Sequence, residues 1–370
     1  MSRIPFIHAQ FPDSSESEKQ LMFRLEKHLR KLRAAKPIPQ DPEDDNFPES
    51  LKPYVQADTK DAGQVITYAD NRRIERRAQR LYKARLAASG LGHLKKEDRQ
   101  RLEALRNGVS LVTIPSEHRA DELAAELHSE MPWMSPATEL IWHAMRASVR
   151  EGWPGLRLPS MLLDGPPGIG KSHFARRLGS LLSLPTTIVE ATSESASFGL
   201  VGGQKGWSEA HPGRVLDTVL HSLVGNPIII VDEIEKAGDV TSHRGQAFRL
   251  VDALLPLLEP MTARKWTCPY FQVGFDMGWI GWILTSNDYS RLPEPLLSRC
   301  PPIRLRDLTI PELAGFLRRQ GASRNLSEDA VEAMIDVLKH PGLRDQRPSL
   351  RVAARMLARA ADLERMPMLH

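Results

Sequence analysis

The sequence predicts an α/β protein in which a parallel β-sheet is flanked by helices, with a C-terminal all-helical lid and an N-terminal helical extension. Three observations predict this architecture. Between residues 114 and 306, short apolar segments alternate with helical ones, as in parallel sheets covered by helices on both faces. In residues 307–370 the apolar spacing is helical throughout. Residues 1–113 are helical and basic, and they contain a proline-rich stretch.

The composition indicates a globular protein of more than one domain. The chain has 370 residues, of which 41% are hydrophobic and 26% are charged, enough for a sizeable core. Two cysteines, Cys268 and Cys300, exclude a disulfide framework and argue against a four-ligand zinc site. No apolar run approaches the ~18 residues of a membrane helix, and no hydrophobic signal core opens the chain. We therefore expect a soluble, cytoplasmic protein with no membrane contact.

The N-terminal extension is rich in positive charge. A helix is expected over residues 16–36, and prolines among acids from Pro37 to Pro53 predict a linker. A helical segment over residues 71–107, interrupted near Gly90 and Gly92, carries twelve basic residues against four acidic ones, whereas the whole chain has a net charge of +4. Nucleic acid or another acidic partner would account for this surplus. So would a solvated helix face, or packing against an acidic neighbouring subunit.

The remaining elements follow in order along the chain. The expected strands cover residues 159–164, 186–190, 228–231 and 280–285, and the expected helices cover residues 122–151, 171–182, 311–319, 327–339 and 349–365.

A glycine-rich loop follows the first strand and opens a helix. It matches the P-loop pattern of Gly, four residues, Gly-Lys-Ser, in which backbone N–H groups surround phosphate oxygens. Lys171 is expected to contact the β- and γ-phosphates, and Ser172 to hold Mg²⁺. The alternative is a chance glycine-rich turn. The residues expected to bind nucleotide here are Gly165, Pro166, Pro167, Gly168, Ile169, Gly170, Lys171 and Ser172.

Two further strands end in polar residues that suit nucleotide hydrolysis. Asp232 ends an apolar strand and is expected to hold Mg²⁺ through water, while Glu233 next to it is expected to act as general base. Asn287 follows another strand and is expected to orient the attacking water beside the γ-phosphate. Acids at strand ends and an asparagine that starts a turn are common without any such role.

These elements in this order resemble an AAA+ ATPase, and more closely the ATPase module of Lon-type proteases. Asn226-Pro227 with Asp232-Glu233-Ile234-Glu235-Lys236 resembles that family's Asn-Pro, apolar strand and Asp-Glu-Ile-Asp-Lys. The segments over residues 254–260 and 293–299 resemble its Leu-Leu-Glu-Val-Leu-Asp-Pro and Pro-x-Pro-Leu-Leu-Asp-Arg. The resemblance covers roughly residues 114–365.

The resemblance implies a homo-oligomeric ring, usually of six subunits, with ATP and Mg²⁺ at each junction. It implies that Arg299 is an arginine finger for the neighbour's γ-phosphate; the alternative role of Arg299 is to cap a surface helix. In the lid helix Arg351 corresponds to the family's sensor-2 arginine, with Arg347 as the alternative. Trp207 corresponds to the pore-loop aromatic that grips polypeptide, unless it is a core residue.

The sequence also departs from the family. Only 19 residues follow Arg351, too few for the Lon protease domain, Ser298 replaces the acid before the finger, and the pore aromatic is Trp rather than Tyr. We therefore expect a protein-remodelling or unfolding ATPase that has no protease domain of its own and that works on a polypeptide client, with a separate protease in trans as an open question. The alternatives are a nucleic-acid-associated AAA+ ATPase that uses the basic N-terminal helices, and an assembly switch with little turnover.

Overall fold

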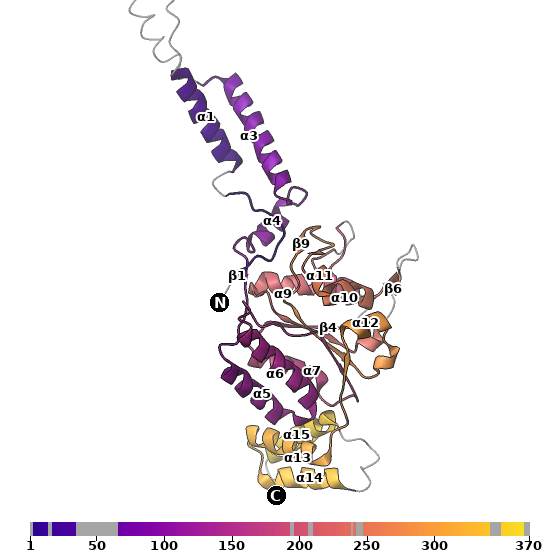
Figure 1. Cartoon of the computed structure of the whole chain (residues 1–370). Helices are drawn as coiled ribbons and strands as arrows, with labels where there is room; N and C mark the ends of the chain where they lie inside the picture. Colours follow the sequence, from indigo (N-terminus) through magenta and orange to yellow (C-terminus); the bar gives the residue numbers. More distant parts are fainter. Residues whose placement is uncertain are drawn as a thin grey trace, which may run out of the picture. The chain divides into compact units, whose positions relative to one another are not determined.

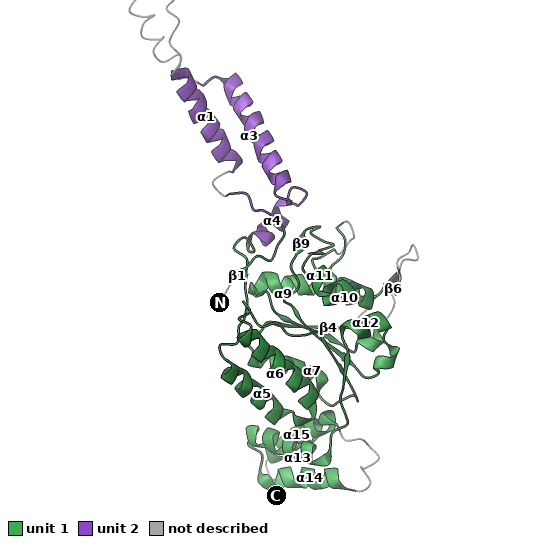
Figure 2. Cartoon of the chain, viewed as in Figure 1, with its two compact units in different colours: residues 1–8, 104–370 green, residues 9–103 purple. Residues whose placement is uncertain are grey.

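The computed structural model describes residues 3–13, 17–34, 66–192, 196–205, 210–237, 240–241, 247–340 and 349–365. The chain forms two compact units, residues 9–103 and residues 1–8 with 104–370 (Figure 2). We expected a boundary at 113/114. The units divide at 103/104 instead. β1 (Arg3–Ile4) pairs with β2 (Val109–Ser110), and the backbone N–H of Ser110 donates to the carbonyl of Leu223 (2.9 Å), so both strands belong to the larger unit.

The smaller unit is built on a helical hairpin. It contains α1 (Glu18–Ala34), α3 (Tyr68–Ala88) and α4 (Lys96–Glu103), which agrees with the two expected helical segments and their interruption near Gly90. Arg33 at the end of α1 pairs with Asp70 at the start of α3 (2.8 Å), so the two helices are antiparallel neighbours. The expected linker over residues 37–53 lies outside the described residues.

The Asp70 carboxylate has a second task at the start of α3. It accepts hydrogen bonds from the backbone N–H and the hydroxyl of Thr67, which caps the helix. These hydrogen bonds, together with the one from Arg33, lower the pKa of Asp70 to about 2. The side chains of α3 that are buried against the unit's interior follow Asp70 at helical spacing, namely Ile74 and Ala78.

The larger unit contains a five-stranded parallel sheet in the order β11-β3-β10-β5-β4. The strands are β3 (Met161–Asp164), β4 (Thr186–Glu190), β5 (Ile228–Asp232), β10 (Gly281–Ser286) and β11 (Pro302–Arg304). This confirms the predicted α/β class with a parallel sheet, and four of the strands lie where expected. The fifth, β11, was missed because it is short and begins with a proline, which is tolerated at the start of an edge strand.

Helices cover both faces of the sheet (Figure 1). On one face lie α5 (Glu117–Glu130), α6 (Ser135–Arg150) and α7 (Lys171–Leu181); on the other lie α9 (Arg214–Ser222) and α10 (Leu250–Leu258). The strands are therefore buried on both sides, which explains the continuous apolar run of β5. The single helix expected over residues 122–151 is wrong: α5 and α6 are separated by a 3₁₀ turn, η3 (Pro132–Met134), because proline cannot continue α5.

The connections add short elements that the sequence did not suggest. These are α8 (Ala196–Val201), η4 (Ile234–Lys236), β6 (Val240–Thr241), β7 (Ala247–Phe248), α11 (Pro260–Ala263), β8 (Trp266–Thr267), β9 (Gly274–Phe275), η5 (Tyr289–Arg291) and α12 (Glu294–Arg299). The last three helices, α13 (Ile310–Ser323), α14 (Glu328–Lys339) and α15 (Leu350–Arg365), form the predicted helical lid.

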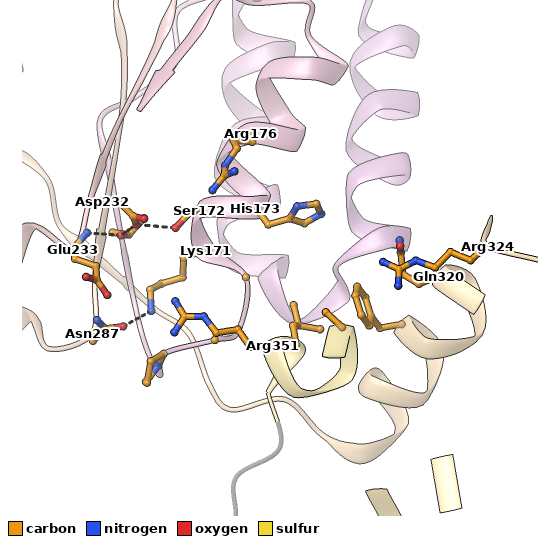
Figure 3. A pocket seen from close by; sticks show the side chains of 17 residues that line it. Lys171, Ser172, His173, Arg176, Asp232, Glu233, Asn287, Gln320, Arg324 and Arg351 are labelled. Carbon is orange, nitrogen blue, oxygen red and sulfur yellow. Dashed lines mark hydrogen bonds between the residues drawn. The ribbon is translucent and has the colours of Figure 1, made fainter. Parts of the chain in front are cut away.

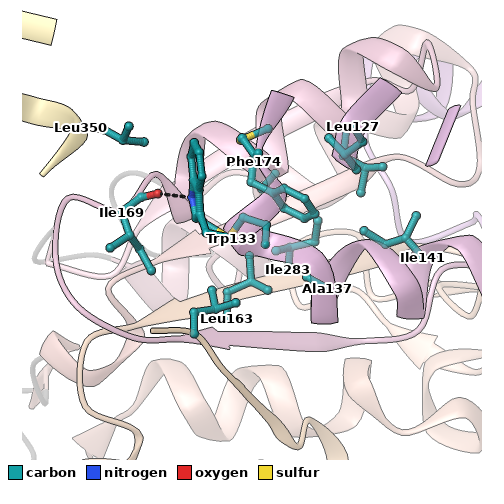
Figure 4. Packing of buried hydrophobic residues seen from close by; sticks show 14 of the residues in the cluster. Leu127, Trp133, Ala137, Ile141, Leu163, Ile169, Phe174, Ile283 and Leu350 are labelled. Carbon is teal, nitrogen blue, oxygen red and sulfur yellow. Dashed lines mark hydrogen bonds between the residues drawn. The ribbon is translucent and has the colours of Figure 1, made fainter. Parts of the chain in front are cut away.

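One hydrophobic core joins the helical layer, the glycine-rich loop and the lid. Trp133 packs between α7 and the sheet and donates its indole N–H to the carbonyl of Ile169 in the loop (2.9 Å) (Figure 4). Ile169 and Leu350, the first residue of α15, belong to the same buried cluster. The glycine-rich loop therefore contacts the hydrophobic core on one side and the start of the lid on the other.

Candidate functional site

The glycine-rich loop connects β3 to α7 and touches the start of the lid helix α15. Gly168 and Gly170 have φ values of +81° and +95°, a backbone conformation that side chains other than glycine disfavour. The carbonyl of Gly168 accepts a hydrogen bond from the backbone N–H of Leu350 (3.0 Å). A Cβ on Gly168 would lie 2.8 Å from the Cβ of Ser349. Glycine here permits both the turn and the close approach of the lid.

Lys171 points into the curve of the loop. Its ammonium donates to the carbonyls of Gly165 (2.6 Å) and Pro166 (3.0 Å) and to the side-chain oxygen of Asn287 (3.0 Å). Burial lowers the pKa of Lys171 to about 8, although the nearby carboxylates of Asp164 and others favour the charged form. The loop and the end of β10 therefore hold one cation at the N-terminus of α7, where an anion is also favoured by the helix dipole.

Ser172 and Asp232 place two oxygen ligands side by side. The Ser172 hydroxyl donates to Oδ1 of Asp232 (2.7 Å), and the same oxygen accepts from the Thr285 hydroxyl (2.5 Å). A hydroxyl and a carboxylate beside a phosphate-binding loop are the oxygen donors that Mg²⁺ uses with a nucleotide. The residues present fit a magnesium ion.

Glu233 lies at the rim of the same site in an unusual backbone conformation. Its φ of +55° falls in the left-handed region, which costs a non-glycine residue about 1–2 kcal/mol. Its backbone N–H donates to the hydroxyl oxygen of Thr285 (3.0 Å), and its carboxylate pairs with Lys236 (2.9 Å). Such strain concentrates at functional sites when neighbours hold it in place. Here the Thr285 hydroxyl hydrogen-bonds to both the Asp232 carboxylate and the backbone N–H of Glu233.

Asn287 is oriented by Glu235. Oε1 of Glu235 accepts from the backbone N–H (3.1 Å) and the side-chain amide (2.8 Å) of Asn287. Because the amide nitrogen is bound on that side, the amide oxygen faces Lys171. A chain of hydrogen bonds therefore runs from Glu235 through Asn287 to the lysine of the loop.

These groups surround a cleft of about 430 Å³ between the sheet and the lid (Figure 3). Lys171, Asp232 and Glu233 lie on the sheet side, and Arg351 reaches in from α15. Further along, the cleft is lined by Arg176 of α7 and by residues of α13. The lining from α13, from Arg324 directly after it and from α15 consists of Phe316, Gln320, Arg324, Leu350, Arg351 and Ala354. Four of the side chains around the cleft are basic, which suits a polyanionic ligand.

The structure brings most of the predicted site residues together. The lining of the cleft includes Pro167, Gly168, Gly170, Lys171, Ser172, Asp232, Glu233, Asn287 and Arg351, and the remaining loop residues are Gly165, Pro166 and Ile169. Arg299 is not part of this cleft: on α12 it donates to the carbonyl of Pro295 (2.9 Å), and its Nε lies 3.6 Å from the Glu259 carboxylate. Trp207 and Arg347 lie outside the described residues.

Several residues of the site were not assigned a role from the sequence, among them Thr285, Glu235, Arg176 and Arg324. Thr285 lies two residues before Asn287, where the apolar strand becomes polar, and Glu235 lies two residues after the paired acid Glu233. The sequence around each of them therefore gave a weak indication of a role. Arg176 and Arg324 had none, because α7 and α13 bring them to the cleft only in the folded chain.

The fold and the site together define a P-loop nucleotide-binding protein. More particularly, residues 161–308 match the family described as "ATPase family associated with various cellular activities (AAA)". This segment runs from the start of β3 to Leu308, just before the lid. The chain thus contains an ATPase domain of the AAA type, and the predicted class of enzyme is confirmed.

The similar curated proteins include Lon proteases. Lon protease 2 of Thermus thermophilus is 28% identical over 174 residues, which is 47% of this chain and 21% of that protein. The peroxisomal Lon protease homolog 2 of Spinacia oleracea is 27% identical over 224 residues, 57% of this chain and 25% of that protein. The homologue of Pichia angusta is 30% identical over 210 residues, 55% and 22% respectively. The chain therefore spans about a fifth to a quarter of these relatives, and the predicted likeness to the Lon ATPase module is confirmed.

Among the helices that the structure describes, none combines the length and the apolar character needed to cross a membrane.

Proposed function

We propose that this protein hydrolyses ATP and uses the energy to remodel or unfold a polypeptide client. The observation that carries the hydrolysis is the meeting of Lys171, Asp232 and Glu233 with the lid arginine Arg351 around one cleft. In such a site the loop and its lysine bind phosphates, and arginine at the far wall neutralises charge on the transferred group.

Each side chain has a defined task in this proposal. Ser172 and Asp232 would hold Mg²⁺, which supplies charge neutralisation at the phosphates when bound. Glu233 accepts the proton of the attacking water, so its ion pair with Lys236 has to open. Asn287 keeps that water in place with an amide that Glu235 orients.

The proposed working form is a homo-oligomeric ring, in which Arg299 completes the site of the neighbouring subunit. Its absence from the cleft of its own chain is what an arginine supplied in trans requires. Ion pairing with Glu259 keeps the side chain on the surface of α12. A hexamer is the ring size proposed from the family resemblance.

The polypeptide client is proposed because the similar proteins are named proteases, and proteases act on polypeptides. Trp207, on the glycine-containing segment between α8 and α9, is the proposed gripping residue, since an aromatic ring contacts extended chains of any sequence through apolar surface.

The test measures ATP turnover with and without an unfolded protein, in the wild type and in Trp207→Ala. We expect the wild type to be stimulated, and the variant to keep its basal turnover while losing stimulation. Glu233→Gln, as the inactive control, should bind ATP with a turnover lower by ~10²–10⁴-fold. A wild type that the unfolded protein leaves unstimulated would refute the client; near-normal turnover in Glu233→Gln would refute the hydrolytic site. A large drop in melting temperature for Trp207→Ala would instead indicate a core residue.

A further inference from the structure

The exposed side of α3 carries a continuous band of positive charge. Taking 100° of rotation per residue, its six exposed cations fall within an arc of about 140°. The same arc otherwise contains only the alanines Ala69, Ala84 and Ala87. The cations, which we call the α3 basic band, are Arg72, Arg73, Arg76, Arg77, Arg80 and Lys83.

The α3 basic band is not balanced by acids. Glu75, the remaining acidic residue of α3 besides the buried Asp70, falls outside the arc. Among the described residues, none of the six cations forms an ion pair with a carboxylate, and Arg72 lies over the Tyr68 ring at 5.8 Å. By contrast, exposed arginines elsewhere in the chain do have carboxylate partners, as Arg318 has in Glu332 and Arg119 in Glu122. A surface that serves only for solvation would not need to separate its charges in this way.

We propose that the α3 basic band binds the phosphate backbone of nucleic acid without reading its sequence. Five of the six cations are arginines, whose planar guanidinium groups bind phosphate oxygens in a bidentate manner. The helix is 21 residues long, which corresponds to about 31 Å at 1.5 Å per residue. The band therefore presents several phosphate contacts in a row, and sequence-independent affinity arises from such contacts.

The chemistry of the arc argues against two other acidic partners. A membrane-binding helix exposes large apolar residues among its cations, whereas the arc contains only alanine between them. The exposed large apolar residues of α3, Tyr68 and Leu81, lie outside the arc, and Ile74 is buried. Protein interfaces are anchored by buried aromatic or large apolar side chains at their centre, and the arc has none. The partner that matches the α3 basic band is a uniformly negative rod, and nucleic acid has that charge and shape.

The experiment measures binding of the full-length protein to a fluorescein-labelled DNA duplex of arbitrary sequence by fluorescence anisotropy across a salt series. The tested variant replaces Arg72, Arg76, Arg80 and Lys83 by Gln, which keeps helix propensity. The matched control removes the same number of charges from exposed, ion-paired positions by replacing Arg30, Arg119, Arg318 and Lys339 with Gln. Circular dichroism checks that both variants keep their helices.

We expect the wild type to bind duplexes of unrelated sequence equally well and the control to match it. The band variant should bind at least tenfold more weakly at low salt. Its plot of log affinity against log salt should be flatter by up to about 0.9 per lost phosphate contact on a duplex, and by about 0.7 on a single strand. Running both nucleic acids shows which one provides the contacts.

Two results would overturn the proposal. One is a band variant with the affinity and salt slope of the wild type. The other is a wild type that prefers polyglutamate or phosphatidylserine vesicles to DNA under the same conditions. Because binding is measured without ATP turnover, the outcome does not depend on the proposed ATPase cycle.

Discussion

Thr285 is the residue on which the two acids of the site depend. Its hydroxyl donates to Asp232 and accepts from the backbone N–H of Glu233, and the residue is fully buried. Neither contact involves a residue near Thr285 in sequence. The hydroxyl, on β10, therefore links Asp232, the proposed metal ligand on the neighbouring strand β5, to Glu233, the proposed general base.

Replacing Thr285 by Val should impair hydrolysis more than nucleotide binding. The substitution keeps the shape but leaves the Glu233 N–H without its acceptor, at a cost of about 1–3 kcal/mol. If that energy is lost in the transition state, turnover falls about five- to 160-fold. Steady-state kinetics with a fluorescent-nucleotide binding assay separate kcat from affinity. Thr285→Ser, which retains the hydroxyl, is the control, and equal turnover in the two variants would contradict the assigned role.

Lys171 should make ATP binding sensitive to pH above neutrality. Burial lowers the pKa of Lys171 to about 8, and phosphates that contact the ammonium favour its charged form. Binding then takes up a proton when the free protein is partly deprotonated, so affinity is full below pH 8 and declines as the pH rises through 8. Calorimetric titration in buffers of different ionisation enthalpy measures this uptake. Absence of proton uptake at pH 8.5 would contradict the depressed pKa.

At the scale of elements, the contact between the loop and α15 joins the lid to the phosphate site. Leu350 donates its backbone N–H to Gly168 and packs into the core cluster, while Arg351 next to it faces the cleft. The first residue of α15, Leu350, therefore binds the loop, and the second, Arg351, lines the cleft.

Gly168→Ala should disturb this contact in a specific way. The new Cβ would lie 2.8 Å from Ser349 Cβ, in addition to the cost of a positive φ. Gly152→Ala is the matched control, because Gly152 also has a positive φ (+62°) but nothing lies within 4 Å of the added atom. We expect both variants to lose a similar amount of stability in a thermal melt from the backbone term, and Gly168→Ala alone to lose affinity for ATP. Equal nucleotide affinity would show that the lid adapts without cost.

At the scale of the whole molecule, the proposed ring makes each site a product of two chains. Arg299→Ala should bind ATP normally and hydrolyse it poorly, since the finger acts on the transferred phosphoryl group. Glu233→Gln should also be inactive. Mixing the two at equal amounts should restore part of the activity, because about a quarter of the junctions in a ring then combine an intact Glu233 with an intact Arg299.

The mixing result is read against each variant alone at the same total concentration. Restoration that appears only in the mixture supports shared sites. A protein that stays monomeric with ATP in light scattering, or a mixture no more active than its parts, would indicate that Arg299 serves only its contacts with Pro295 and Glu259 in its own chain.

The features of this protein that have a local cause could be predicted from the residues alone. Apolar runs that suit strands buried on both faces predicted four of the five sheet strands, and the glycines, Lys171 and Ser172 identified the loop because phosphate binding needs that backbone in consecutive residues. Asp232 at the end of β5, Glu233 directly after it and Asn287 after β10 could be predicted, since parallel strands bring their carboxyl ends to one edge.

The contacts between residues far apart in the sequence form only when the chain folds and could not be predicted. Lys171 meets Asn287 and Asp232 meets Thr285 across more than 50 positions of chain. Arg176 reaches the cleft from α7, and Arg324 reaches it from the residue directly after α13. The split of one expected helix at Pro132 and the return of residues 3–4 to pair with β2 also escaped prediction. Periodicity reports which face of an element is buried but not which element covers it, so side-chain partners are fixed only when the layers pack.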